Sequence, residues 1–118
     1  MIQGYEDIVA YQKSYELALR VYEMAKGLPK EEMFGLSSQI KRAALSIPLN
    51  IAEGYGKRAS AAEFKRFLAM SKGSCNEVQV LLHFIRDMEY IDATRHDTLY
   101  AGYDEVGKIL NGLIQSWK

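Results

Sequence analysis

The sequence contains very little cysteine and carries no net charge. Cys75 is the single cysteine among 118 residues, which excludes an internal disulfide and a metal cage built from cysteines alone. Fifteen basic and fifteen acidic residues cancel, so the chain as a whole has no general attraction to phosphate or anionic lipid. Charges interrupt every hydrophobic segment before it reaches the roughly 18 residues that a bilayer requires. We therefore expect no membrane span.

The N-terminal residues also lack a targeting signal. Met1 to Tyr5 contain neither the basic leader nor the apolar run of a secretory signal, so we expect a cytoplasmic protein. A chain of this length is typical of one domain, here 1–118, which can bury roughly 60% of the surface that its unfolded form exposes.

Apolar residues recur at steps of three and four almost throughout, which predicts amphipathic helices and is incompatible with the alternation of half-buried strands. We expect helices at about 6–26, 31–55, 60–90 and 93–117. Ser60 and Glu63 have the spacing of a capping box for the third helix, and Asp92 or Thr94 would cap the fourth. Short links and one apolar seam on each helix predict an all-α fold, an antiparallel up-down-up-down four-helix bundle.

Pro48 lies inside the second predicted helix, whose apolar pattern continues in phase on both sides of it. Proline removes the hydrogen bond from its own nitrogen to the Ala44 carbonyl and crowds that carbonyl. We therefore predict a kink at Pro48, with Ala44 in need of another donor. The alternative is a break of the helix at 46–48.

A line of polar side chains follows the same helix beside its apolar seam. It consists of Gln39, Arg42, Ser46, Asn50 and Glu53. Serine and asparagine are poor helix formers at interior positions, so we interpret the line, together with Pro48, as a buried or interfacial hydrogen-bond network. The alternative is a solvated face. Asn50 or Ser46 would serve the Ala44 carbonyl. Glu53 would hold Arg42 of a neighbouring chain or cap the turn at 55–56.

Positive charge is concentrated between residues 41 and 72, where seven basic and two acidic residues give a local charge of +5. The basic residues are Lys41, Arg42, Lys57, Arg58, Lys65, Arg66 and Lys72. Arg58, Lys65 and Arg66 can come together around the start of the third helix. We interpret the set as a surface for nucleic-acid phosphates, with simple solvation of an exposed face as the alternative. Tyr55 could stack on an unpaired base, although a tyrosine there is more often core or interface.

No catalytic, cofactor or metal motif is found. A di-iron site in a helical bundle requires glutamates followed three residues later by histidine, and no glutamate here has that partner. His83 and Asp87 share a helical face, but two ligands make a poor metal site and we interpret them as a surface or interface pair. We therefore expect a protein that is not an enzyme and uses no cofactor, metal or small-molecule substrate.

The run from Gly35 to Gly56, GLSSQIKRAALSIPLNIAEGYG, closely resembles the signature of the 23S ribosomal RNA intervening-sequence proteins, also called four-helix-bundle proteins. Segments 9–13, 28–32, 63–68 and 73–74 fit the same pattern in the same order, so the resemblance covers essentially the whole chain. Leu49 departs from the pattern, because alanine is more usual there, and it adds volume beside the predicted kink.

This resemblance implies a bacterial antiparallel four-helix bundle that is similar to the accessory variability determinant of diversity-generating retroelements. It also implies a ring-shaped homopentamer with a basic outer surface that binds structured RNA or DNA, and no established catalytic activity. We therefore expect a homo-oligomer, a pentamer, that binds structured nucleic acid or a nucleoprotein partner. A protein-protein interaction or scaffold bundle without nucleic-acid affinity is the alternative.

Overall fold

The computed structural model describes all 118 residues and contains four long helices and no strand. The helices are α1 (Val9–Ala25), α2 (Leu36–Gly56), α3 (Ala61–Asp87) and α4 (Ala93–Ser116). Two short 3-10 turns, η1 (Tyr5–Asp7) and η2 (Lys30–Glu32), precede α1 and α2. The prediction of an all-α chain is confirmed.

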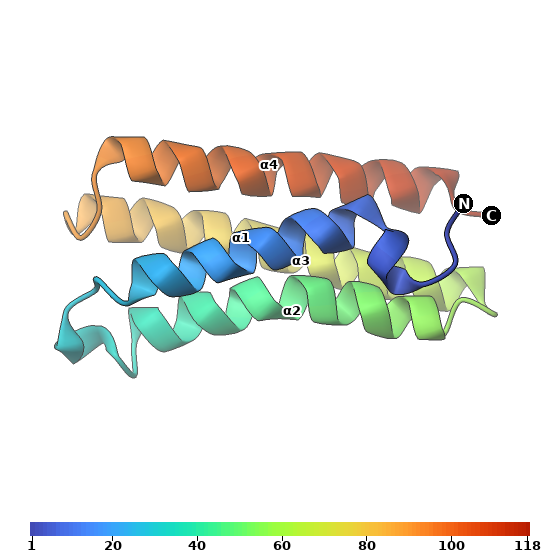
Figure 1. The fold of residues 1–118 in the computed structure, drawn as a ribbon, viewed down its shortest axis with the longest axis horizontal. Helices are drawn as coiled ribbons and strands as arrows, with labels where there is room; N and C mark the ends of the chain where they lie inside the picture. Colours follow the sequence, from blue (N-terminus) through green and yellow to red (C-terminus); the bar gives the residue numbers. More distant parts are fainter.

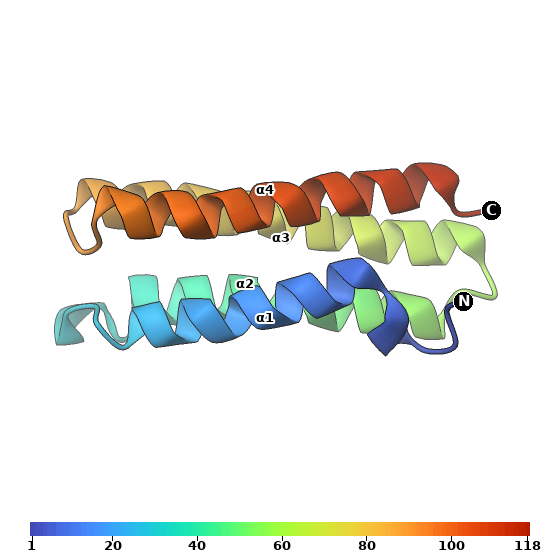
Figure 2. The same ribbon diagram turned by 45° about the horizontal axis from the view of Figure 1, so that its top comes forward.

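The four helices lie side by side in a bundle 44 Å long (Figure 1). α1 and α3 each pack against both α2 and α4, whereas the diagonal pairs make no close backbone approach. In Figures 1 and 2 each helix runs in the direction opposite to the helix before it. Both chain termini lie at the end of the bundle where α2 joins α3 (Figure 2).

Side-chain caps define where α3 and α4 begin. The Ser60 hydroxyl accepts a hydrogen bond from the Glu63 amide at 3.2 Å, as the sequence predicts. The Asp92 carboxylate accepts one from the Arg95 amide at 2.8 Å, so Asp92 rather than Thr94 caps α4.

α2 begins at Leu36, five residues later than the predicted start at 31. The intervening residues form η2, and the backbone of Gly35, with φ −108° and ψ −111°, separates this turn from the helix. Glu32 joins the two parts, because its Oε1 accepts a hydrogen bond from the Leu36 amide at 3.3 Å. Its Oε2 accepts one from the Tyr90 hydroxyl at 3.1 Å. The apolar pattern alone did not reveal this local arrangement.

Two other helix ends differ from the prediction by three residues. α1 begins at Val9 rather than 6, because η1 forms first and the Asp7 carboxylate accepts a hydrogen bond from the Gln3 amide at 2.8 Å. α3 ends at Asp87 rather than 90, because Glu89 adopts a left-handed conformation with φ 64° that stops the helix.

α2 is continuous through Pro48, so the alternative of a break at 46–48 is wrong. The kink stays a prediction. One hydrophobic core joins all four helices, and Phe64 and Tyr103 are among its largest fully buried side chains. A Cβ atom added to Gly54 would lie 2.6 Å from the Cβ of Phe67, so α2 and α3 approach each other closely at this end because residue 54 has no side chain.

None of the four helices combines the length and the apolar character needed to cross a bilayer.

Candidate functional site

Three of the seven basic residues gather at the turn between α2 and α3. The Lys57 ammonium lies 5.2 Å from the centre of the Phe67 ring, and the Arg66 guanidinium lies 4.6 Å from the same ring. The Arg58 guanidinium lies 4.0 Å from the centre of the Tyr55 ring, and its Nη1 donates to the Tyr55 carbonyl at 2.9 Å. We call Lys57, Arg58 and Arg66 the basic elbow. Aromatic faces thus hold all three cations in defined positions.

One cation of the basic elbow is paired with a carboxylate. Arg66 and Glu63 form two parallel contacts, at 3.0 Å and 3.2 Å. The hydrogen bond from Arg66 holds the pKa of the Glu63 carboxyl below its usual value, and the same bond raises the pKa of Arg66. Lys57 and Arg58 are exposed and form no ion pair. Lys57 and Arg58 therefore present positive charge to solvent without an ion pair, while the Glu53 carboxylate lies near enough to act on Arg66.

Tyr55 belongs to the core. Its side chain is buried, its ring packs edge-on against Phe64 with centroids 6.1 Å apart, and the Arg58 guanidinium lies over the ring. A ring in this position has no open face for a base. The structure therefore favours the core interpretation of Tyr55 over base stacking.

Lys41 and Arg42 do not join the basic elbow. Lys41 lies near the opposite end of α2, where its ammonium is 5.3 Å from the Tyr22 ring of α1. Arg42 is exposed and forms no hydrogen bond or ion pair. The basic residues concentrated between 41 and 72 in the sequence are thus spread over α2, the turn after it and α3.

Lys65 and Lys72 belong to the flank between α3 and α4. The Lys72 ammonium donates to the Asn111 side-chain oxygen of α4 at 3.0 Å. Lys65 precedes Lys72 by seven residues and shares its helical face, whereas Arg66 is turned by about 100° toward α2. No hydrogen bond or ion pair links Lys65 to Arg58 or Arg66, so the expectation that it would join them stays a prediction.

The polar line along α2 divides into two parts. Ser46 and Asn50 are half-buried: the Ser46 hydroxyl bonds the Ser74 hydroxyl of α3 at 2.6 Å and the Ala43 carbonyl at 2.8 Å. The Asn50 amide donates to the Ser46 carbonyl at 2.7 Å. Neither side chain bonds the Ala44 carbonyl, because Ser46 bonds the Ala43 carbonyl and Asn50 bonds the Ser46 carbonyl instead.

The remaining members, Gln39, Arg42 and Glu53, are exposed, and their side chains form no hydrogen bond within the chain. Glu53 does not cap the turn at 55–56, where Arg58 bonds the Tyr55 carbonyl instead. A serine outside the polar line supplies a hydrogen bond to this part of α2. Ser71 of α3 is fully buried and donates its hydroxyl to the Ile47 carbonyl at 2.9 Å.

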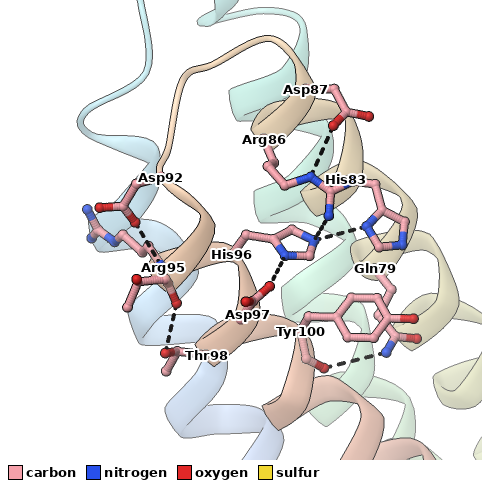
Figure 3. A network of polar contacts seen from close by, with 11 residues as sticks. Gln79, His83, Arg86, Asp87, Asp92, Arg95, His96, Asp97, Thr98 and Tyr100 are labelled. Atoms are coloured by element: carbon pink, nitrogen blue, oxygen red, sulfur yellow. Dashed lines mark hydrogen bonds and ion pairs between the residues drawn. The ribbon is translucent and has the colours of Figure 1, made fainter.

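A network of histidines that the sequence did not predict lies where α3 joins α4 (Figure 3). His96 is only 3% exposed, and its Nδ1 lies 2.8 Å from a carboxylate oxygen of Asp97. Its Nε2 lies 2.9 Å from Nδ1 of His83 and 3.5 Å from the Arg86 guanidinium. Because a guanidinium can only donate, Nε2 of His96 accepts, and His83 must donate through Nδ1. The rings of His83, His96 and Tyr100 stack on one another.

The predicted pairing of His83 with Asp87 is therefore wrong, since Asp87 pairs with Arg86 at 3.0 Å. Recognising the histidine pair requires the position of the turn between α3 and α4, which brings together residues 13 positions apart. No group of three or more histidine, cysteine or carboxylate side chains lies close enough to hold a metal ion.

Comparisons with known proteins agree with this architecture. A family model described as 23S rRNA-intervening sequence protein matches residues 6–112. Among solved structures, the chain is similar to a protein of unknown function from the S23 ribosomal protein family of Bacteroides thetaiotaomicron. The two are 30% identical over 94% of this chain and 99% of that chain, with a TM-score of 0.84. No curated protein matches significantly.

Proposed function

The chain belongs to the 23S rRNA-intervening sequence protein family, and we propose that it is a non-enzymatic, homo-oligomeric bundle that binds structured RNA or DNA through its basic elbow. A nucleoprotein that presents such a nucleic acid is an equivalent partner. One observation carries the proposal: Lys57 and Arg58 are exposed, held in place and without a carboxylate partner. Cations in this state release counterions from a phosphate backbone when they bind it.

The aromatic contacts favour binding because they restrict the cations beforehand. A free lysine or arginine side chain loses rotamer freedom when it is fixed against a ligand. Here the rings of Phe67 and Tyr55 have already limited that freedom for Lys57 and Arg58. Arg58 also carries a planar guanidinium, whose geometry suits two hydrogen bonds to one phosphate group.

A homo-oligomer is supported by apolar side chains exposed between α1 and α2. Tyr15, Leu19, Tyr22 and Leu45 line a shallow apolar groove of about 250 Å³. Leu49, the departure from the family pattern, is 62% exposed and extends this apolar surface rather than filling the core. Such a surface favours contact with another copy of the chain. We expect the oligomer to be a pentamer, which would repeat the basic elbow around a ring.

Light scattering coupled to size exclusion tests the oligomer. We expect the mass of a pentamer for the wild type and a smaller mass for Leu45→Glu, because the new carboxylate would be buried without a partner in the contact. Val80→Glu is the control, since Val80 is 65% exposed on α3, outside the apolar groove. A monomeric wild type would contradict the proposal.

Fluorescence anisotropy of labelled RNA and DNA hairpins across salt concentrations tests nucleic-acid binding. We expect wild-type affinity to fall steeply as salt rises. Reversing the charge of Lys57 and Arg58 to glutamate should weaken binding at least about tenfold and reduce the salt slope by about 2. Lys13 and Arg20 of α1, which form exposed ion pairs with Glu105 of α4 and with Glu16, are the control for the same change.

A protein-protein scaffold without nucleic-acid affinity is the second candidate. Phe84 of α3 and Phe34 beside η2 favour it, because their side chains are 54% and 93% exposed. A wild-type protein that binds no hairpin at any salt concentration would support the scaffold and exclude the first candidate.

A further inference from the structure

A polar groove lies between α3 and α4, about 300 Å³ in volume. Its walls carry mostly amide and charged side chains, so it differs from the usual apolar ligand pocket, although its volume reaches the lower end of the range of small-molecule sites. We call it the amide groove. The polar residues that line it are Lys72, Asn76, Gln79, Asp104, Lys108 and Asn111. Successive members on each helix are three or four residues apart, so each helix contributes one continuous face.

The charges in the amide groove are unequally paired. Lys108 forms an ion pair with Asp104 at 3.3 Å. Lys72 is half-buried and bonds only the neutral side chain of Asn111, at 3.0 Å. An ammonium group has three donors, so two remain after this bond. The groove therefore holds one uncompensated positive charge with unused donors, a setting that favours an oxyanion such as phosphate.

Amide side chains surround that charge. The Asn111 oxygen already accepts from Lys72, which leaves its NH₂ group to donate. Asn76 is exposed and forms no hydrogen bond, and Gln79 makes one long contact, 3.5 Å, to the Tyr100 carbonyl beside the histidine network (Figure 3). Amides both donate and accept, and in this they match the edges of nucleobases. Asparagine inside a helix also lowers helix propensity, so solubility alone does not account for it.

The shape of the amide groove suits an unpaired nucleotide better than a duplex. It lies between two packed helices, and Tyr103, which is fully buried and whose hydroxyl has no partner in the chain, also lines it. A single nucleotide fits a volume of this size, whereas a duplex hides its base edges inside its own grooves. Lys65 lies on the same face of α3, about 10 Å along the helix from Lys72 toward the basic elbow. Positive charge thus leads from the elbow to the groove.

We propose that the amide groove binds one unpaired nucleotide of the nucleic acid held by the basic elbow, with Lys72 on the phosphate and the three amides on the base edge. The inference rests on the proposed function, because it requires that the chain bind nucleic acid. It goes beyond that function by assigning the unpaired part of a structured nucleic acid to the flank between α3 and α4.

The test uses the intact chain and two labelled probes: an RNA stem closed by an adenine-rich loop, and the same stem as a blunt duplex. We expect Asn76→Ala combined with Asn111→Ala to weaken anisotropy-detected binding of the stem-loop about tenfold and leave duplex binding within about twofold. Lys72→Ala should weaken stem-loop binding and lower its salt slope by about 1. Gln115→Ala removes an exposed amide of α4 outside the groove and should change neither probe.

The outcomes separate this inference from the proposed function. If the wild type binds both probes and the amide double variant binds them equally well, the groove assignment is overturned while binding at the basic elbow stands. If the wild type binds neither probe, both fall. Adenosine monophosphate serves as competitor: if it displaces the stem-loop at micromolar concentration, the groove is a site for a free nucleotide, which also overturns the assignment to nucleic acid.

Discussion

The Ser71 hydroxyl of α3 donates a hydrogen bond to the Ile47 carbonyl of α2, one residue before Pro48. Ser71 is fully buried, and no solvent can replace this bond. One turn farther along α3, Ser74 bonds Ser46 at 2.6 Å. The small side chains in the middle of α3 therefore supply hydrogen bonds across the bundle to the part of α2 where the proline has removed one from the helix.

Ser71→Ala should lower the free energy of unfolding by about 1–2 kcal/mol, because the Ile47 carbonyl loses a buried donor. Chemical denaturation followed by circular dichroism measures this. Ser116→Ala is the control, since that hydroxyl is exposed and its contact is long, 3.5 Å. Equal stability of the Ser71 variant and the wild type would show that the bond contributes nothing.

Gly54→Ala should destabilise the protein by about 1–3 kcal/mol, because the new methyl group would lie 2.6 Å from the Phe67 Cβ and 3.1 Å from the Phe64 ring. Gly73→Ala is the matched control, because no atom of another helix lies within 4 Å of the position that its new methyl group would take. The control should gain up to about 1 kcal/mol from helix propensity. Changes in melting temperature of the same sign for both variants would contradict the close approach of α2 and α3.

Tyr103→Phe should stabilise the protein by about 1 kcal/mol near neutral pH, since the Tyr103 hydroxyl is buried without a partner in the chain. The gain should grow in alkali. Burial raises the folded-state pKa of Tyr103 above the ordinary 10.0. Ionisation of Tyr103 therefore leaves the wild type's free energy of unfolding unchanged below about pH 10 and lowers it as the pH rises toward the folded-state pKa.

Denaturation of both proteins between neutral pH and pH 11 measures the Tyr103 effect. Phenylalanine cannot ionise, so the variant should lose less stability than the wild type above about pH 10. Burial also raises the pKa of Cys75 to about 12. The loss of stability in alkali that follows from Cys75 has the same sign in the variant and the wild type. Tyr5→Phe, at an exposed position outside the apolar groove, is the control. Parallel pH curves for the Tyr103 variant and the wild type would contradict the prediction.

Glu89→Gly should raise the free energy of unfolding by about 1 kcal/mol, because residue 89 has φ 64°, a conformation that costs any residue with a Cβ atom. The backbone hydrogen bond from Tyr90 to Ile85, 3.0 Å, should remain. Glu89→Ala keeps the Cβ atom and should bring no such gain. If both variants are equally stable in urea, the left-handed conformation carries no measurable strain.

The parts of the fold that follow from repetition could be predicted from the sequence. Each helix repeats its apolar step over several turns, so a single irregular residue does not hide it. The caps at Ser60 and Asp92 are local and were also predictable. The start of α2 was not, because Glu32 secures it through both the Leu36 amide and the distant Tyr90.

The candidate site was predictable in composition but not in layout. Neighbours such as Lys65 and Arg66 occupy different flanks, since successive helical residues differ by about 100°. Pairings between helices, such as Lys72 with Asn111 and His83 with His96, depend on how far α3 is shifted along α4. That shift results from packing of the whole core, which a single sequence does not display.

Phe67 contacts both the core and the basic elbow. Its Cβ closes the space over Gly54, and its ring supports both Lys57 and Arg66. The spacing between these two charges is therefore determined by how the interior is packed, not by the surface residues alone. A substitution that moves this ring would alter recognition of an anionic partner while the number of charges stays the same, so melting temperature and affinity should change together across a series of such variants.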